Sequence, residues 1–198
     1  VRIGIPEEYS QTVLPAALSA LAIRHPAVEV TVSCDYTAHN LAALEKDELD
    51  LAVVFDWSNQ NKGEVLCVDP TVWVTSLVHR VHEAVPLPIA VYRDSTWCRD
   101  FALKSLEQIG RRYRIAFIAD TSSGLKNAVS AGLAVTTLSR SNIPHGCREL
   151  TSDDGFPPVD SSRVVLRRNP YHSSEAIREL AEMVREAFQP MSSLLLQP

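Results

Sequence analysis

The sequence lacks the cysteine spacing and the long apolar runs that mark several common classes of protein. Cys34, Cys67, Cys98 and Cys147 form no C-x-x-C pair and have no histidine at metal-ligand spacing, so the sequence predicts no metal site. We expect free, buried thiols in a reducing cytoplasm, with a redox-sensing pair as the alternative. No stretch approaches the roughly 20 apolar residues of a membrane span, so we expect no membrane partner.

Motifs of enzyme active sites are also missing. The sequence contains no G-x-S-x-G elbow, no P-loop and no G-x-G-x-x-G, so we predict no catalytic residue and no cofactor. With 19 Lys and Arg against 24 Asp and Glu, the net charge is -5, which argues against a nucleic-acid-binding face on this segment. The basic run from Arg111 to Arg114 is predicted to be a solvated turn, and His79 and His82 are predicted to be solvated loop histidines rather than metal ligands.

The first third of the chain alternates between the hydrophobic periods of strands and helices. Predicted strands cover residues 1–5, 28–32 and 50–55, predicted helices cover 12–24 and 38–48, and a polar loop covers 7–11. This β-α-β-α-β order predicts a parallel sheet with right-handed crossovers. Ligands of such sheets bind at the carboxyl ends of the strands.

The rest of the chain repeats this order. Strands are predicted at 64–68, 71–76, 88–92, 113–119 and 134–138, and helices at 97–109 and from 122 to about 131. Leu125, Ala128 and Val129 lie on one face of the second helix, and Gly132 stands where it would end. Residues 142–162 are predicted to be mostly loop. A strand at 163–167 and a helix at 174–188 follow, and residues 189–198 are expected to be mobile.

Two such repeats and a returning strand predict an α/β protein with two Rossmann-like lobes. We assign residues 1–69 and 162–198 to lobe I and residues 70–161 to lobe II, with crossings near 68–71 and 160–164. Two crossover connections between two such lobes define a type II periplasmic-binding-protein fold. The cleft between the lobes is then the predicted binding site.

Four stretches resemble the effector-binding domain of LysR-type transcriptional regulators, and together they cover essentially the whole chain. They are V-R-I-G-I with L-P-A-A-L-S-A-L-A-I-R-H-P-A-V-E-V, L-A-A-L-E-K-D-E-L-D-L-A-V-V, A-V-S-A-G-L-A-V-T-T-L-S-R-S, and S-S-E-A-I-R-E-L. The sequence departs from the family where an H-P-L segment is usual after Ser76, and where T-L-S-R replaces L-L-P after Gly132. The resemblance implies a small-molecule effector, a homodimer or homotetramer, a cytoplasmic location, and DNA binding only through a winged helix-turn-helix domain expected before Val1.

Pocket positions carried over from this resemblance fall at strand ends and helix starts. The candidate effector-binding residues are Glu8, Tyr9, Ser10, Tyr36, Thr37, Phe55, Asp56, Trp57, Trp97, Thr121, Ser122 and Ser123, with Asp94, Ser95 and Thr96 beside Trp97. The alternative is structural, because Ser and Thr also cap helices and tryptophans also pack in cores. Glu8, Asp56 and Asp94 would make the cleft acidic, which suggests a neutral or cationic effector.

A secreted solute-binding protein of a transport system shares this fold and is the alternative function. A helix-turn-helix segment upstream of Val1 would favour the regulator, whereas a signal peptide there would favour the transport protein. In the regulator family, the antiparallel dimer is built from the segments that correspond to residues 12–24, 28–32 and 123–131. Exposed apolar side chains on these segments would indicate the same interface here.

Overall fold

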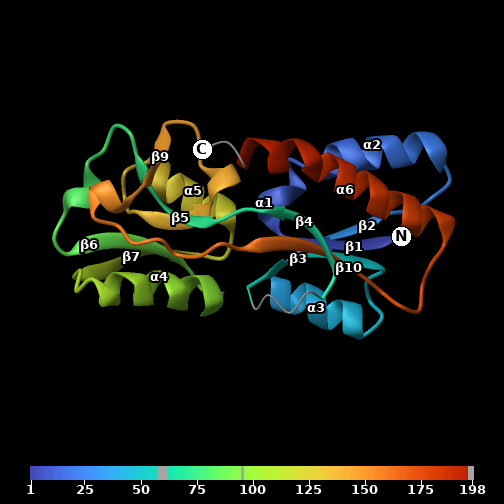
Figure 1. The fold of residues 1–198 in the computed structure, drawn as a ribbon, viewed down its shortest axis with the longest axis horizontal. Coiled ribbons are helices and arrows are strands. Elements are labelled where there is room, and N and C mark those ends of the chain that lie inside the picture. The colour runs from blue at the N-terminus through green and yellow to red at the C-terminus, as the bar shows by residue number, and fades with distance from the viewer. Residues whose placement is uncertain (58–61, 95, 196–198) are drawn as a thin grey trace. The chain divides into compact units, whose positions relative to one another are not determined.

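The chain divides into two compact units, and it crosses from one to the other twice. The computed structural model describes residues 1–57, 62–94 and 96–195, with side chains for all of them except 96–98 and 192–195. Unit 1 comprises Val1–Asp69 and Ser162–Pro198, and unit 2 comprises Pro70–Ser161. The chain therefore leaves unit 1 after Asp69 and returns to it at Ser162 (Figure 1).

Unit 1 is built on a five-stranded sheet with the order β2-β1-β3-β10-β4. Its elements are β1 (Arg2–Ile5), α1 (Glu7–Ser10), α2 (Leu14–Arg24), β2 (Thr31–Cys34), α3 (Thr37–Glu45), β3 (Leu51–Asp56), β4 (Glu64–Val68), β10 (Arg163–Arg168) and α6 (Glu175–Leu195). β1 pairs in parallel with β2 and β3, as predicted. β10, however, lies antiparallel between β3 and β4, so the complete sheet is mixed rather than parallel.

Both faces of this sheet are covered, which explains the uninterrupted apolar run of β3. Leu51 and Val53 join the core cluster that α2 and α6 form on one face, whereas Ala52 and Val54 join the cluster of α3 on the other. Figure 1 shows α2 and α6 on one side of the sheet and α3 on the other. Side chains of a strand alternate between faces, so a strand buried on both sides has to be apolar at successive positions.

Unit 2 repeats the strand order of unit 1. Its elements are β5 (Thr71–Ser76), the 3-10 turn η1 (Val81–Glu83), β6 (Leu87–Tyr92), α4 (Thr96–Gln108), β7 (Tyr113–Ala119), α5 (Ser122–Ser130), β8 (Thr136–Ser139), the 3-10 turn η2 (Arg140–Asn142), β9 (Cys147–Leu150) and the 3-10 turn η3 (Ser152–Asp154). β6 pairs in parallel with β7, and a parallel bridge between Ile89 and Val135 joins β6 to the start of β8. β5 lies antiparallel between β8 and β9. The strands thus follow the order β7-β6-β8-β5-β9, in which β5 holds the place of β10.

Four stretches of the backbone differ from the prediction because distant packing decides them. Residues 7–10 form the short helix α1 instead of a loop, and β2 is at Thr31–Cys34 rather than 28–32, because its partner β1 begins only at Arg2. β9 was not predicted within the loop-rich segment 142–162. α6 continues through Pro190 to Leu195, so the expected mobile tail is helical there, with Met191 packed against the core of unit 1.

Two side chains predicted to be solvated are packed instead. The guanidinium of Arg111 lies 4.2 Å from the ring centroid of Phe156, and it donates a hydrogen bond to the carbonyl of His82. The His82 ring is largely buried, and its Nδ1 lies 3.4 Å from Oγ1 of Thr75. The cysteines also differ from the expectation, since of Cys34, Cys67 and Cys147 only Cys67 is buried.

Candidate functional site

In unit 1, the candidate residues lie where β1, β2 and β3 end. α1 follows β1 directly, α3 begins three residues after β2, and Trp57 follows β3. Because the three strands are parallel, these ends lie at one edge of the sheet. The sequence-predicted residues of unit 1 are therefore brought to one edge, as the strand order requires.

Thr37 fastens the start of α3 to the end of β3. Its hydroxyl oxygen accepts a hydrogen bond from the backbone N–H of Phe55 at 3.0 Å, and the side chain is buried. The preceding residue, Tyr36, has the extended backbone of an N-cap but makes no side-chain capping bond. Its backbone N–H donates a hydrogen bond to Oδ1 of Asp35 at 2.7 Å instead. Thr37 therefore fixes the start of α3 against the end of β3.

A row of aromatic rings runs from the end of β3 into the core of unit 1. Trp57 stacks on Phe55 with 5.7 Å between ring centroids and 14° between the planes. Phe55 contacts Tyr9 at 5.7 Å, and Tyr9 contacts Phe188 of α6 at 5.2 Å. Trp57 is half-buried, whereas Tyr9 is completely buried and its hydroxyl donates to Asp69 Oδ2 at 2.8 Å. The row leads from a partly exposed indole to a fully enclosed phenol.

Carboxylates gather at this edge of unit 1. Glu7 and Glu8 occupy the first turn of α1, Asp56 ends β3, and Asp69 follows β4. Arg163 stands opposite Asp56 in the ladder between β10 and β3, where it brings a positive charge. Burial and the negative charge of Asp69 together raise the pKa of the neighbouring Cys67 thiol to about 12. Cys67 therefore stays a thiol at physiological pH.

In unit 2, the candidate residues lie at the start of α5. Thr121 caps the helix, since its hydroxyl accepts the N–H of Gly124 at 3.1 Å. Ser122 is buried and Ser123 is exposed. The first-turn N–H groups of a helix and the positive end of its dipole favour an anionic or carbonyl ligand at such a position. Thr121 is thus a helix N-cap, which is the structural alternative to ligand binding given for this residue. Ser123, two residues further on, is at the surface.

Two basic side chains near these strand ends, Arg93 and Lys126, were not among the residues predicted from the sequence. Arg93, just after β6, pairs with Asp120 after β7 at 2.7 Å. Lys126 of α5 donates to the amide oxygen of the buried Asn142 at 2.8 Å, which ties the helix to the turn after β8. These contacts join residues that are 16 and 27 positions apart in sequence, so no local sequence motif predicts them. Asp94 is exposed, Ser95 lies outside the described residues, and the side chains of Thr96 and Trp97 are not described.

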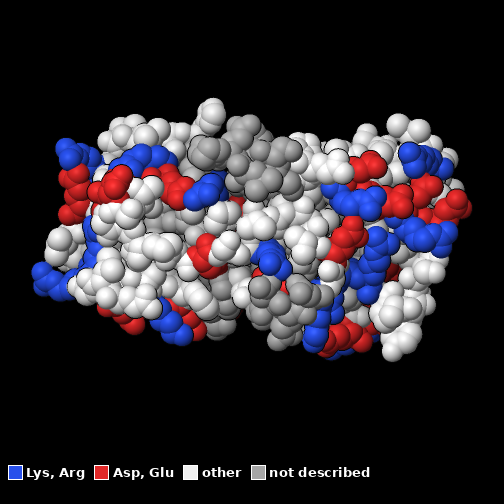
Figure 2. All heavy atoms as spheres, in the orientation of Figure 1, with Lys and Arg blue, Asp and Glu red and all other residues white. Residues whose placement is uncertain are grey.

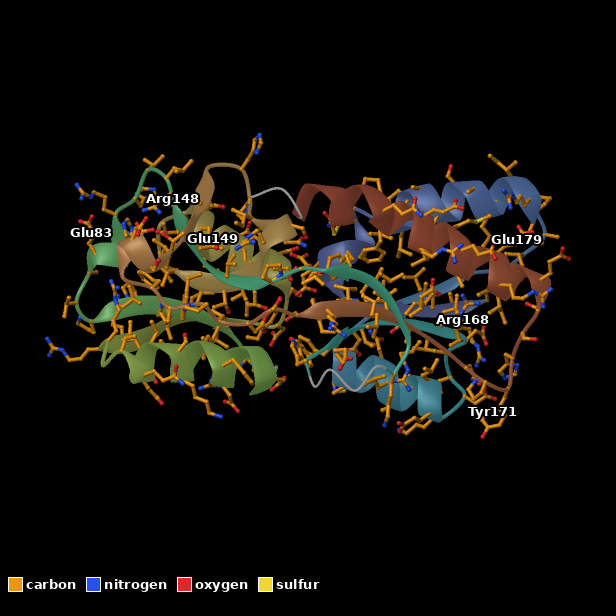
Figure 3. All side chains as sticks on the ribbon, in the orientation of Figure 1. Glu83, Arg148, Glu149, Arg168, Tyr171 and Glu179 are labelled. Atoms are coloured by element: carbon orange, nitrogen blue, oxygen red, sulfur yellow. The ribbon has the colours of Figure 1, made fainter. Side chains whose placement is uncertain are left out.

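Charges of both signs are interleaved on the visible face of each unit (Figure 2). Arg148 and Glu149 are neighbours on β9 (Figure 3), but they pair with different partners, Asp154 at 2.7 Å and Arg140 at 2.8 Å. Across the described residues, no group of three or more His, Cys, Asp and Glu could hold a metal ion. In the same part of the chain, no helix combines the length and apolarity needed to cross a membrane.

Two units of matching strand order, linked by two crossings, define a type II periplasmic-binding-protein-like fold. The LysR substrate-binding domain family matches residues 1–189, and the chain therefore belongs to this family. The family is one of effector-binding domains of transcriptional regulators, not of enzymes. The resemblance read from the sequence is confirmed, and the regulator interpretation is supported over the transport protein.

Relatives and solved structures agree on this assignment. The HTH-type transcriptional regulator DgdR of Burkholderia cepacia is 26% identical over 182 residues, which cover 90% of this chain and 62% of the relative. PecT of Dickeya dadantii (strain 3937), also an HTH-type transcriptional regulator, is 27% identical over 173 residues, covering 87% of this chain and 55% of the relative. The chain thus spans less than two thirds of either relative.

Two solved structures with bound small molecules share the fold. The regulatory domain of Synechocystis PCC6803 CcmR in complex with 2-PG has a TM-score of 0.73 at 15% identity, covering 96% of this chain and 98% of that domain. The effector-binding domain of QuiR in complex with shikimate has a TM-score of 0.68 at 12% identity, covering 96% and 97%. At these identities the likeness concerns the fold alone.

Proposed function

We propose that this chain is the effector-binding domain of a cytoplasmic transcriptional regulator, and that a small molecule binds between unit 1 and unit 2. The observation that carries the proposal is the gathering of candidate residues at the strand ends of each unit, in a chain of this family. A ligand that contacts both units binds a closed arrangement better and shifts the population toward it. DNA would be bound by a segment outside this chain, as the greater length of DgdR and PecT suggests.

Within the proposed site, unit 1 would supply Glu8, Ser10, Asp56 and Trp57, and unit 2 would supply the start of α5 with Ser123. Thr37 and Thr121 would act indirectly, because their hydroxyls already accept backbone N–H groups. The carboxylates at the edge of unit 1 favour a neutral or cationic effector. Isothermal titration calorimetry with matched sets of amines and carboxylates tests this preference. Stronger binding of the carboxylates would contradict it.

A thermal-shift screen of small metabolites tests the proposed site itself. A hit that raises the melting temperature of the wild type should lose at least tenfold in affinity with Asp56→Ala, or with Ser123→Leu, which blocks the start of α5. Asp153→Ala, in the 3-10 turn η3, is the control and should bind as the wild type does. A hit whose affinity is unchanged by both site substitutions would contradict the proposed location.

The chain would also form a homodimer through α2 and β2 of one copy and α5 of the other, as the family resemblance implies, and we add the edge strand β7 to this interface. β2 and β7 are edge strands of their sheets. Apolar side chains are exposed on or beside these elements: Ile23 is 81% exposed, Val32 38%, Ile118 44% and Leu133 47%. Unit 1 carries nine Lys and Arg against fifteen Asp and Glu, and unit 2 carries ten against nine. An antiparallel arrangement would place the acidic unit against the slightly basic one.

Analytical ultracentrifugation tests this interface. Ile23→Glu and Ile118→Lys should each weaken the dimer by at least tenfold, because a charge placed in an apolar interface stays unpaired. Val85→Glu alters a residue that is more exposed than Ile118 but lies in a loop of unit 2 outside the proposed interface, and it should leave the association unchanged. If the wild type is monomeric at micromolar concentration, the dimer proposal is wrong.

A further inference from the structure

Tyr9 joins the first loop of the candidate site to the place where the chain leaves unit 1. Its hydroxyl donates a hydrogen bond to Asp69 Oδ2 at 2.8 Å, and both residues have no exposed surface. Tyr9 belongs to α1, directly after β1, whereas Asp69 is the last residue before the first crossing. This bond spans 60 positions of sequence, and its acceptor Asp69 directly follows β4 in the chain.

The two crossing segments are themselves held together on each side. On the side of unit 1, the N–H of Asp69 donates to the carbonyl of the buried Ser162 at 2.9 Å. On the side of unit 2, the N–H of Thr71 donates to Asp160 Oδ1 at 3.1 Å. Asp69 therefore makes two fixing contacts at once: its backbone binds the returning segment and its carboxylate binds α1.

The surroundings of Tyr9 leave α1 little freedom to move independently. Its ring is enclosed between Phe55 at the end of β3 and Phe188 of α6. Close-packed interiors transmit displacements rather than absorbing them. In addition, a buried carboxylate is costly unless hydrogen-bonded, so Asp69 resists losing the phenol. A shift of α1 would therefore reach Asp69 through a rigid side chain.

We propose that Tyr9 is a positioning residue whose bond to Asp69 couples α1 to the crossing between the units. This inference rests on the proposed function, in which the effector contacts the loop after β1. Tyr9 itself does not touch the effector. Residues beside it on α1, Glu8 and Ser10, make that contact, and Tyr9 carries the resulting shift of α1 to Asp69 and the paired crossing segments.

Amide hydrogen exchange measured by NMR on the full chain tests the coupling without any ligand. Tyr9→Phe removes only the hydroxyl, and we expect the amides of Asp69 and Thr71 to exchange about three- to tenfold faster, the factor that one net hydrogen bond provides. Asp69→Ala, which removes the accepting oxygen, should act in the same way, and the double variant should add little to either. Tyr113→Phe is the control, because it removes an exposed phenol-to-carboxylate bond, to Glu107 at 3.0 Å, between two residues of unit 2 that belong to neither crossing segment.

A second cycle asks whether a disturbance in α1 itself travels to the crossing. Ser10→Ala removes the bond from the Ser10 hydroxyl to the carbonyl of Glu7, which lies within α1. We expect it to speed exchange at Asp69 in the wild type but not when Tyr9 is already phenylalanine.

Two results would overturn the proposal. One is unchanged exchange at Asp69 and Thr71 in Tyr9→Phe, and the other is an equal acceleration of all amides in unit 1, which would show a purely structural role. Neither measurement involves an effector. Failure of the coupling is therefore distinguishable from failure of the proposed binding site, which the calorimetry and the thermal-shift screen test.

Discussion

The turn between α3 and β3 in unit 1 has the same backbone geometry as the turn between α5 and β8 in unit 2. A different residue occupies the left-handed position of each turn. α3 ends with bonds from the N–H of Asp47 to Leu44 and from Glu48 to Ala43, and α5 ends with the corresponding bonds from Gly132 and Leu133. This is the Schellman pattern, which requires a positive φ. The value is 63° at Asp47 and 68° at Gly132.

The surroundings explain why the two units differ at this position. A Cβ on Gly132 would lie 2.2 Å from the ring of His79, so no side chain fits there. Asp47 instead has room, and its carboxylate accepts bonds from Asn169 at 2.6 Å and His172 at 2.7 Å. In unit 1 the left-handed residue, Asp47, fastens the connection between β10 and α6. In unit 2 the left-handed glycine leaves room for the ring of His79. The same backbone geometry thus serves two different packing needs.

The largest effect should come from Gly132→Ala. The substitution forces a Cβ into a left-handed residue and against His79, and we expect the free energy of unfolding to fall by about 2–5 kcal/mol. Chemical denaturation measures it. Gly110→Ala is the matched control, because Gly110 has a φ of 66° and open space around it, and it should cost about 1–2 kcal/mol.

A variant without the His79 ring separates the cost of the steric clash from the cost of the left-handed backbone. In the His79→Ala background, Gly132→Ala should cost no more than Gly110→Ala does. A cost that stays as large as in the wild type would show that His79 is not the obstacle, and the contrast with Asp47 would then need another explanation.

Asp47 should show the reverse preference. Asp47→Gly keeps the left-handed turn but loses the bonds to Asn169 and His172, whereas Asp47→Ala loses the bonds and adds backbone strain. Both should lower stability, and alanine should be worse than glycine by about 1 kcal/mol. Thermal unfolding of the two variants side by side gives this difference. If Asp47→Gly stabilises the chain, the fastening role of Asp47 is refuted.

Acid should weaken carboxylate contacts in both units. The hydrogen bond from Asn169 holds the pKa of Asp47 below its ordinary value of 3.8, and the bonds from Arg148 and Thr151 hold the pKa of Asp154 far below it. A depressed folded-state pKa gives stability that is complete above the unfolded value and is lost as pH falls through the folded one. We therefore expect stability to decline below about pH 4 and this decline to be shallower in Asp154→Asn than in the control Asp153→Asn.

The smallest effect concerns the helix starts of the candidate site. Thr121→Ala removes the cap of α5 and should cost about 1 kcal/mol. Tyr36→Ser supplies α3 with the side-chain cap it lacks and should change stability by less than about 1 kcal/mol in the favourable direction. Circular dichroism melts of both variants compare the two helix starts. Equal losses in the two would indicate that Tyr36 is held by contacts other than the cap.

The fold was largely predictable because hydrophobic period follows burial. β4, β5 and β7 were predicted at their observed boundaries, and the stop of α5 before Gly132 followed from its glycine. α6 shows the limit of this reasoning. Pro190 predicts an end to a helix, but burial of Phe188 and packing of Met191 beyond it hold the helical path.

The candidate site was less predictable, since hydroxyl and carboxylate side chains choose partners across the fold. Thr37 was recognised as a helix-start residue, but its bond to Phe55 depends on where β3 lies. Likewise, the sequence placed Tyr9 among residues that contact a ligand, and only the packed structure shows that its hydroxyl reaches Asp69. Local pattern thus locates the strand ends, and tertiary contacts decide which side chains at those ends are already engaged.

The position of β10 in the sheet has a consequence for biosynthesis. Unit 2 is one continuous stretch of chain, whereas the sheet of unit 1 stays open between β3 and β4 until residues 163–168 have been made. Domains fold as they emerge from the ribosome, in order of synthesis. We therefore expect the later-encoded unit 2 to reach its native state first, while the amino-terminal strands wait for the carboxyl end of the chain to complete their sheet.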